Sequence, residues 1–364
     1  MHGIISYMPG GAQKSLSEAL DIPSFTNNEC DIHVCTDICF GNVSCGGFFI
    51  SLMGRFALMF CSRHPKLQRQ PDIRSTHTQF YRPIMAAKAP IHMKVHVINV
   101  AKLCSALRVE AFQGDPPKIC TSMHLLVTDL TSAGITVATG WYLNPPPFQV
   151  NLQKLETDDD PRWICYHPPF APNGWHRAHS YVRTFVPVDH SRGSLNAGQW
   201  MTPGWDCEPL GSPIRQRPAK WTNSMIPFAL DMNLIHYDYD DLFADAFGLQ
   251  RHKPHTSKAV NSGKAQRLAR QQGSNSWRAS SQDGFGVAQK FINTTLCSSV
   301  EIKKRLPAEG VRWLYLRSEL RHVKNSQMDI GSLLFDENME LIAVSHEVAQ
   351  VTHSDVKEAP RSRL

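Results

Sequence analysis

The sequence predicts an α+β protein made of two similar units, each a central helix wrapped by a curved antiparallel sheet. Three observations lead to this prediction. An apolar helical stretch followed by several strand-length runs occurs twice along the 364 residues. A zone rich in proline and aromatic residues separates the two occurrences. Pairing the two units into one continuous sheet would also cover strand edges that would otherwise be exposed.

The first unit opens with an apolar stretch at residues 46–60, "GGFFISLMGRFALMF", whose length and composition predict a helix. Four strand-length runs follow it: "STHTQFYRP", "IHMKVHVINV", "CSALRVEAFQGD" and "KICTSMHLLVTDL". Each contains β-branched and aromatic residues in partial alternation and is bounded by turn residues. We therefore expect the first unit at residues 38–145, preceded by an N-terminal extension at 1–37.

The second unit repeats this order. The stretch "PFALDMNLIHYDYDDLFADAFG" predicts the corresponding helix, ending at Gly248. Its strands are predicted from "TTLCSSVEIKKRLP", "VRWLYLRSELRHV", "MDIGSLLFDENM" and "ELIAVSHEVAQV". We expect this unit at residues 178–352, with a tail at 353–364. The runs "PPP" and "HPPFAP" are incompatible with central strands and helix interiors, so we predict a linker at 146–177.

A basic segment interrupts the second unit. Seven Lys or Arg and no Asp or Glu lie between residues 251 and 282, among many Ser, Gly and Gln. We predict a low-complexity insertion at 250–290 that is disordered or poorly packed. The alternative is an arm for an anionic partner, such as nucleic acid or the phosphates of a coenzyme. Because no RNA- or DNA-binding motif accompanies the segment, we do not expect a nucleic-acid partner.

The composition is that of a soluble globular protein, with 42% hydrophobic and 19% charged residues. The N-terminus lacks the basic region and sustained apolar core of a signal peptide. The longest apolar run, at residues 46–60, is interrupted by Arg55 and is too short to span a bilayer. We therefore expect a cytoplasmic protein with no membrane partner.

Four of the ten cysteines cluster near His33, which raises the question of a zinc site; they are Cys30, Cys35, Cys39 and Cys45. Their spacings are not those of a compact structural zinc site. We expect free thiols, as in a reducing compartment, and no metal.

The stretch "CFGNVSCGGFF" offers two interpretations. Ser44 or Cys45 could be a nucleophile on a sharp turn, but a serine-hydrolase elbow requires Gly-x-Ser-x-Gly, and position 42 is Asn. Alternatively, Gly46 and Gly47 open the helix, and its unpaired N–H groups polarise a bound carbonyl. We favour the helix terminus, with Ser44 and Cys45 as turn and lining residues.

Taken in order, several motifs resemble the double hot-dog acyl-CoA thioesterases. The first hot-dog is matched by "GNVSCGGFF", "HPKL", "THTQFYRP" and "VHVINVAKLCSALRVEAFQ", and the second by "FALDMN", "TTLCSSVEI", "RWLYL" and "GSLLFDENMELIAVSHE". The resemblance covers most of residues 38–130 and 178–351. It implies two fused hot-dog domains, an acyl-CoA or carrier-bound polyketide substrate, and hydrolysis without a cofactor or covalent intermediate. Such proteins can also associate further, so a homo-oligomer is compatible with it.

In the family resembled, an Asp, a Thr and a Gln hold and activate a water molecule. The Asp corresponds to Asp231, inside the apolar stretch "FALDMN". The Thr corresponds to Thr295, with Thr294 as a near-equal alternative. Counting back from Pro307 without a gap leads instead to Cys297.

The Gln position is where this sequence departs from the family. It holds Glu347, with His346 beside it, and along a strand these two side chains point to opposite faces. If close, Asp231 and Glu347 would repel each other or share a proton. The water-activating network is therefore either rewired or lost. A pair of His346 and Asp231 would instead resemble the chemistry of hot-dog dehydratases.

Five residues are predicted to bind substrate: Asn42, Gly46, Gly47, Phe48 and Thr294. The changed Gln position keeps a second function open, a non-hydrolytic cyclase or lyase of natural-product biosynthesis. It would resemble a Diels–Alderase or a dehydratase and would fold its substrate into a reactive conformer within an apolar groove. Fungal relatives of this type are associated with secondary metabolism. A binding module without catalysis is a third reading.

Overall fold

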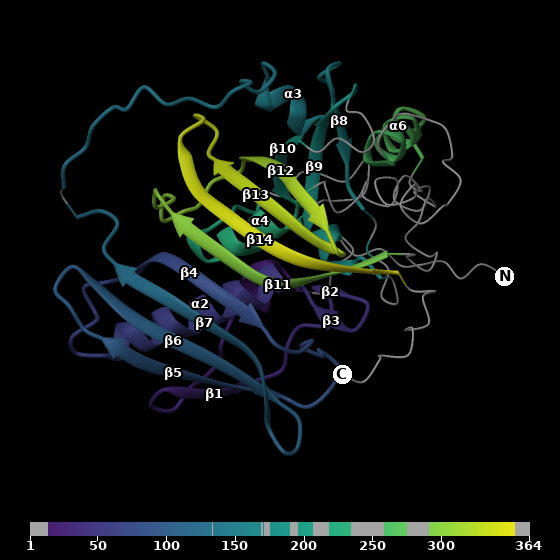
Figure 1. The fold of residues 1–364 in the computed structure, drawn as a ribbon. Coiled ribbons are helices and arrows are strands. Elements are labelled where there is room, and N and C mark those ends of the chain that lie inside the picture. The colour runs from purple at the N-terminus through teal and green to yellow at the C-terminus, as the bar shows by residue number, and fades with distance from the viewer. Residues whose placement is uncertain are drawn as a thin grey trace.

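The computed structural model describes residues 14–132, 134–168, 170, 175–189, 196–206, 218–233, 258–274 and 291–353. Within these residues, twelve strands form one antiparallel sheet that curves around two central helices (Figure 1). The strands lie in the order β1-β5-β6-β7-β4-β11-β14-β13-β12-β10-β9-β8. This arrangement confirms the predicted α+β class with two helix-and-sheet units.

The first unit supplies five neighbouring strands of the sheet: β1 (Glu29–Ile32), β4 (Asp72–Phe80), β5 (Ile91–Asn99), β6 (Cys104–Gln113) and β7 (Lys118–Thr128). The second unit supplies β8 (Trp163–Tyr166), β9 (Val182–Pro187), β10 (Asn196–Pro203), β11 (Phe291–Ile302), β12 (Leu314–Lys324), β13 (Gln327–Phe335) and β14 (Leu341–His353). A short hairpin, β2 (Cys39–Phe40) with β3 (Val43–Ser44), lies outside this sheet.

The two units have the same topology. After its central helix, each unit has four successive strands whose spatial order is first, fourth, third, second: β4-β7-β6-β5 and β11-β14-β13-β12. The two first strands, β4 and β11, pair antiparallel with each other, and His77 lies opposite Ser299. This pairing joins the units into one sheet, as the duplicated sequence pattern predicted.

The central helices α2 (Gly46–Arg63) and α4 (Ile226–Asp231) pack against each other inside the curve of the sheet. Helix α2 is apolar nearly all round, and its first three turns are buried, including Phe48, Phe49 and Phe56. Such a helix is stable only where other elements cover it, which the sheet and α4 do here. Helix α4 ends at Asp231, the acidic residue that the sequence placed inside an apolar stretch.

Three segments for which the sequence predicted no helix or strand contain regular structure. Strand β1 lies within the predicted N-terminal extension and pairs with β5. Strand β8 lies within the predicted linker and pairs with β9. Helix α6 (Lys258–Gln271) lies within the predicted basic insertion, with Ala259 and Val260 buried against β8. The backbone of His167 also exchanges two hydrogen bonds with the Gln266 side chain.

Helix α6 is therefore packed, and the prediction of a poorly packed segment was wrong for residues 258–271. The predicted end of the central helix at Gly248 lies outside the described residues. Across the described residues, none of the helices combines the length and apolar character needed to cross a membrane.

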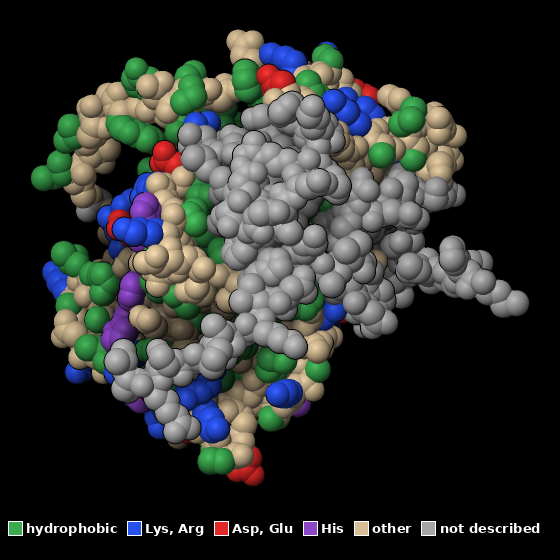
Figure 2. Space-filling view, turned by 45° about the vertical axis from the view of Figure 1, so that its right-hand side comes forward, with side chains coloured by type: hydrophobic (Ala, Val, Ile, Leu, Met, Phe, Trp, Pro, Cys, Tyr) green, Lys and Arg blue, Asp and Glu red, His purple; other side chains and the backbone are tan. Residues whose placement is uncertain are grey.

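The outer face of the sheet is largely polar. His77, His124 and His346 are exposed there, and Figure 2 shows histidine side chains at the surface among basic and apolar ones. The inner face of β7 is apolar, with Met123 and Leu125 buried, whereas β4 and β14 also turn polar side chains inward, such as Thr78 and Glu347. The alternation along each strand therefore separates a wet face from the face that holds the helices.

Candidate functional site

The candidate site lies where the start of α2 meets the end of α4. The Gly47 N–H donates a hydrogen bond of 2.7 Å to Oδ2 of Asp231. A Cβ at Gly47 would lie 2.5 Å from both the Asp231 Cβ and the Pro227 carbonyl oxygen. Glycine is therefore required here because the two helices approach too closely for any side chain. The carboxylate gains a backbone donor at the positive end of a helix dipole.

A second donor to the same carboxylate oxygen is the Cys45 thiol, with Sγ 3.1 Å from Oδ2 of Asp231. Burial, with Asp231 adding a smaller effect, raises the pKa of the Cys45 thiol well above its ordinary value. The thiol is therefore protonated and donates, and a thiolate nucleophile is disfavoured here. Ser44 is buried, and its hydroxyl bonds to the Cys45 carbonyl. The geometry supports the helix-terminus interpretation over the nucleophile.

Thr295 and Glu347 meet Asp231 from the sheet. The Thr295 hydroxyl donates a hydrogen bond of 2.7 Å to Oε1 of Glu347. Asp231, Thr295 and Glu347 line one small inner void of about 10 Å³, together with Gly46 and other residues. A void of this volume is on the scale of one water molecule. The three predicted polar residues therefore converge on a single small space at the start of α2.

Glu347 is 8% exposed. Burial and the nearby charge of Asp231 raise the pKa of Glu347 to about 8, and the bond from Thr295 opposes that shift. A carboxyl with such a pKa carries its proton at neutral pH. Protonated Glu347 presents a carbonyl-type acceptor, used by Thr295, and one O–H donor, so it offers an acceptor and a donor as a glutamine side chain does, with one donor fewer.

The structure separates the two neighbouring candidates on β14. His346 points to the outer face, where its Nε2 lies 2.9 Å from Oδ2 of Asp329, and its side chain is 45% exposed. The prediction of His346 as a catalytic residue was wrong, because alternation along the strand turns it away when Glu347 faces inward.

The three candidates on β11, Thr294, Thr295 and Cys297, lie on either side of a β-bulge. The pairing with β14 shifts between Thr295 and Cys297, so Leu296 is the extra residue. Of these candidates, Thr295 is the one whose hydroxyl meets Glu347. Thr294 is exposed and lines the larger cavity beside the site.

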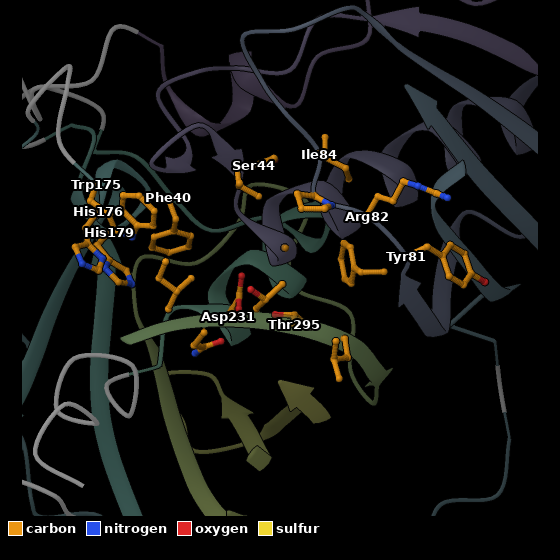
Figure 3. Close-up of a pocket in the computed structure, with 18 residues that line it drawn as sticks. Phe40, Ser44, Tyr81, Arg82, Ile84, Trp175, His176, His179, Asp231 and Thr295 are labelled. Carbon is orange, nitrogen blue, oxygen red and sulfur yellow. The ribbon is translucent and has the colours of Figure 1, made fainter. Parts of the chain in front are cut away.

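That larger cavity has a volume of about 420 Å³ and reaches Gly46, Asp231 and Thr295. Figure 3 shows Asp231 and Thr295 between two groups of side chains. Phe40, Trp175, His176 and His179 lie on one side, and Tyr81 and Arg82 lie on the other; further lining residues include Val43, Ser44, Phe80, Pro83, Ile84, Ile292, Asn293 and Leu296.

Three of the five predicted substrate-binding residues do not line this cavity. Asn42 is exposed on the β2–β3 turn, where its carbonyl accepts a hydrogen bond from Ala86. Phe48 is fully buried in the core, because it lies on the inward side of α2. Gly46 and Thr294 do line the cavity, whereas Gly47 lines only the inner void.

Sequence reasoning missed the aromatic residues of the cavity. Trp175 and His176 belong to the proline-rich zone that was predicted to be a linker, and His179 lies in the short 3-10 helix η1 (Arg177–Tyr181). The signal available was the concentration of aromatic residues and histidines in that zone. Tertiary contacts, among them the bridge between Phe40 and His176, bring it to the site.

Cysteine and metal chemistry were also considered. The cysteines of the described residues are free, and Cys45 contacts the candidate site. Within the described ranges, no cluster of three or more His, Cys, Asp or Glu side chains is placed to hold a metal ion.

Comparison with known proteins agrees with this geometry. Residues 211–351 match the family model of the acyl-CoA thioesterase C-terminal domain. The thioesterase-like protein TwmA of Talaromyces wortmannii is 22% identical over 362 residues, covering 94% of this chain and 93% of that protein.

Solved structures share the fold at low sequence identity. A Thermobifida fusca protein assigned to thioesterase II superposes with a TM-score of 0.58 at 14% identity, covering 93% of this chain and 97% of its own. A hot-dog protein of Alicyclobacillus acidocaldarius gives 0.56 at 11% identity, covering 94% and 99%. The chain thus has the hot-dog fold of these structures, in two units, and its residues 211–351 are similar to the acyl-CoA thioesterase C-terminal domain.

Proposed function

We propose that this protein hydrolyses an acyl-thioester by direct attack of a water molecule, without a covalent acyl-enzyme. The observation that carries the proposal is the convergence of Asp231, Thr295 and Glu347 on one water-sized void beside the first turn of α2. Acyl-CoA and carrier-bound polyketide thioesters are both candidate substrates. The family match of residues 211–351 supports this reaction class.

In this proposal Asp231 is the general base. Its Oδ2 is held by Gly47 and Cys45, so the carboxylate is oriented before substrate arrives. The water oxygen bonds to the thioester carbon as Asp231 takes its proton. Collapse of the tetrahedral intermediate then breaks the carbon–sulfur bond, and Asp231 returns the proton to the departing thiolate.

Glu347 acts in its protonated form. The bond from Thr295 fixes one carboxyl oxygen, and the O–H on the other donates to the water or to the developing oxyanion. This role accounts for a glutamate where the family resembled has glutamine. It also avoids placing two charged carboxylates in one small void.

Gly46 supplies the approach for the substrate carbonyl. It lines both the cavity and the inner void, and a Cβ there would lie 3.5 Å from Thr295 Oγ1 and 3.7 Å from Asp231 Oδ2. The absence of a side chain lets a carbonyl come close to the first backbone donors of α2. The chemistry then uses backbone from the first unit and side chains from the second.

The test is purified protein with a panel of acyl-CoA and acyl-pantetheine esters, following thiol release with a colour reagent. Asp231→Asn should lower kcat by about 10²- to 10⁴-fold, the usual contribution of a general base. Asn retains an oxygen that can accept from Gly47, so the variant should remain folded. Asp329→Asn is the matched control, because Asp329 faces His346 on the outer surface and should not affect the rate. Wild-type rates in Asp231→Asn would contradict the proposal.

One observation favours the second candidate, a non-hydrolytic cyclase or lyase. The 420 Å³ cavity carries aromatic side chains that could hold a folded substrate by shape. Such an enzyme would release no thiol from any ester, and shape-based cyclisation could survive the Asp231→Asn change. The same panel therefore separates the two functions.

A further inference from the structure

The side of the cavity formed by Phe40, Trp175, His176 and His179, here called the aromatic wall, consists of four flat rings. The Phe40 ring meets His179 at a centroid distance of 4.9 Å and His176 at 5.8 Å, both edge to face. The two imidazoles are stacked, with centroids 5.3 Å apart and planes 11° from parallel. Figure 3 places this group beside Asp231 and opposite Tyr81.

The aromatic wall is held rigidly. Arg177, which is buried, donates from Nε to the Thr36 carbonyl and from Nη2 to the Gly41 carbonyl, at 2.9 and 2.6 Å. The Gly41 N–H donates to the Trp175 carbonyl at 2.7 Å. Gly41 also has φ +56°, and a Cβ there would lie 2.7 Å from the Trp175 ring. The indole therefore lies flat on a glycine, and the wall is fixed before substrate enters.

Two of the four wall residues come from the zone between the two units. Trp175 and His176 come from the zone between the two hot-dog units, outside the segments that resemble thioesterases. They reach the site because Phe40 and His176 form a β-bridge. The wall therefore joins the hairpin before α2 to this zone and faces the same cavity as Asp231 and Thr295.

Resting on the proposed function, we propose that the acyl group bound in this cavity is planar and conjugated, an aryl or polyene acyl group, and that the aromatic wall selects it. Ring faces and edges gain from a flat π-system in stacked or edge-to-face geometry beyond the burial of area. A saturated alkyl chain gains only from burial, for which aliphatic side chains would serve equally. Four rings in fixed mutual orientation are the arrangement expected for a flat ligand.

The experiment uses three N-acetylcysteamine thioesters whose acyl groups have equal carbon number: cinnamoyl, 3-phenylpropanoyl and nonanoyl. Each kcat/KM is divided by the rate of the same ester with hydroxide, because conjugation lowers intrinsic reactivity. We expect cinnamoyl to exceed nonanoyl by about tenfold after this correction. Phe40→Leu and His176→Leu should each lower that ratio about threefold. Tyr81→Leu, an aromatic change on the other side of the cavity, should leave it unchanged.

A corrected ratio at or below one would overturn the inference while leaving thioesterase activity intact. Equal effects of Phe40→Leu and Tyr81→Leu would also overturn it. If no ester is hydrolysed, the proposed function fails, and the amide analogues of the three esters test the wall by equilibrium dialysis. Tighter binding of the cinnamoyl amide, reduced by Phe40→Leu, would then support selection by the wall, and equal binding of all three would contradict it.

Discussion

The starts of the two central helices, α2 and α4, are related by the duplication, but the groups that surround them differ. At the start of α2, the Gly47 N–H bonds to the Asp231 carboxylate, 2.7 Å away. At the start of α4, the Phe228 N–H bonds in the same manner to the Ser51 hydroxyl, 3.2 Å away. The first place opens through Gly46 to the 420 Å³ cavity, whereas the second borders a void of about 50 Å³.

The strand residues that face the two helix starts also differ, being polar at α2 and aliphatic at α4. Counting from the central pair of His77 and Ser299, Thr295, which lies next to the bulge, corresponds to Ile73. Glu347, which lies opposite Ser298, corresponds to Leu125, which lies opposite Thr76. The positions of Thr295 and Glu347 are therefore occupied by aliphatic residues in the first unit.

The duplication therefore repeats the architecture, whereas the polar side chains of the candidate site occur at only one of the two helix starts. The proposed site takes backbone donors from the first unit and side chains from the second, so neither unit would hold it alone. The following predictions test that asymmetry, beginning with the largest expected effect.

Replacing the adjacent glycines Gly46 and Gly47 by alanine should have different effects. Gly46→Ala places a Cβ at ordinary contact distance from Thr295 and Asp231, so the protein should fold, but the carbonyl approach is blocked. We expect kcat/KM to fall about a hundredfold with little change in Tm. Gly47→Ala places a Cβ 2.5 Å from the Asp231 Cβ and should lower Tm instead. Thermal melts and esterase rates of both variants check this, and similar melting losses would contradict it.

Thr295→Val should lower kcat about tenfold, because it removes the donor that fixes Glu347. Thr294→Val is the matched control, since this neighbouring hydroxyl is exposed at the cavity. Steady-state rates of both variants with one readily hydrolysed ester test this prediction. A larger loss in Thr294→Val would assign the role to the neighbour.

Glu347→Gln should keep the activity at pH 7 and change its dependence on pH. With the pKa of Glu347 at about 8, wild-type activity should fall above that pH as the O–H donor is lost, whereas the amide cannot ionise. Stability should respond too. The unfolded chain releases the proton near its ordinary pKa of 4.5 while the folded chain keeps it, so wild-type stability should decrease between pH 4.5 and 8.

Rates and melting temperatures of wild type and Glu347→Gln across that pH range provide the test. The variant should lose this component of the pH dependence in both measurements. An unchanged fall in activity above pH 8 would show that another group controls it.

Ser51→Ala removes the counterpart hydrogen bond to Phe228 and should have the smallest effect. We expect the free energy of unfolding to fall by about 1 kcal/mol. The rate of hydrolysis should not change, because Ser51 is remote from the cavity that holds substrate. Denaturant unfolding with parallel assays measures both quantities, and a loss of activity would mean that the second place takes part in catalysis.

The sequence by itself determined the repeated order of a helix and four strands, because that order is written in local periodicity and turn residues. Through a family pattern it also predicted Gly46, Gly47, Asp231, Thr295 and Glu347, together with Thr294, His346, Asn42 and Phe48. Local signals were sufficient here, since an apolar helix with glycines at its start and an acidic residue in an apolar stretch are visible without contacts.

Tertiary structure alone decided the rest. The register of β14 and the bulge in β11 set which of His346 and Glu347, and which of Thr294 and Thr295, faces inward, and register depends on strand pairing rather than on local sequence. The Cys45 thiol meets Asp231 across 186 positions of the chain, and the aromatic wall joins Phe40 to a zone that reads as a linker. Contacts between segments so far apart in sequence arise only when the sheet closes around its two helices.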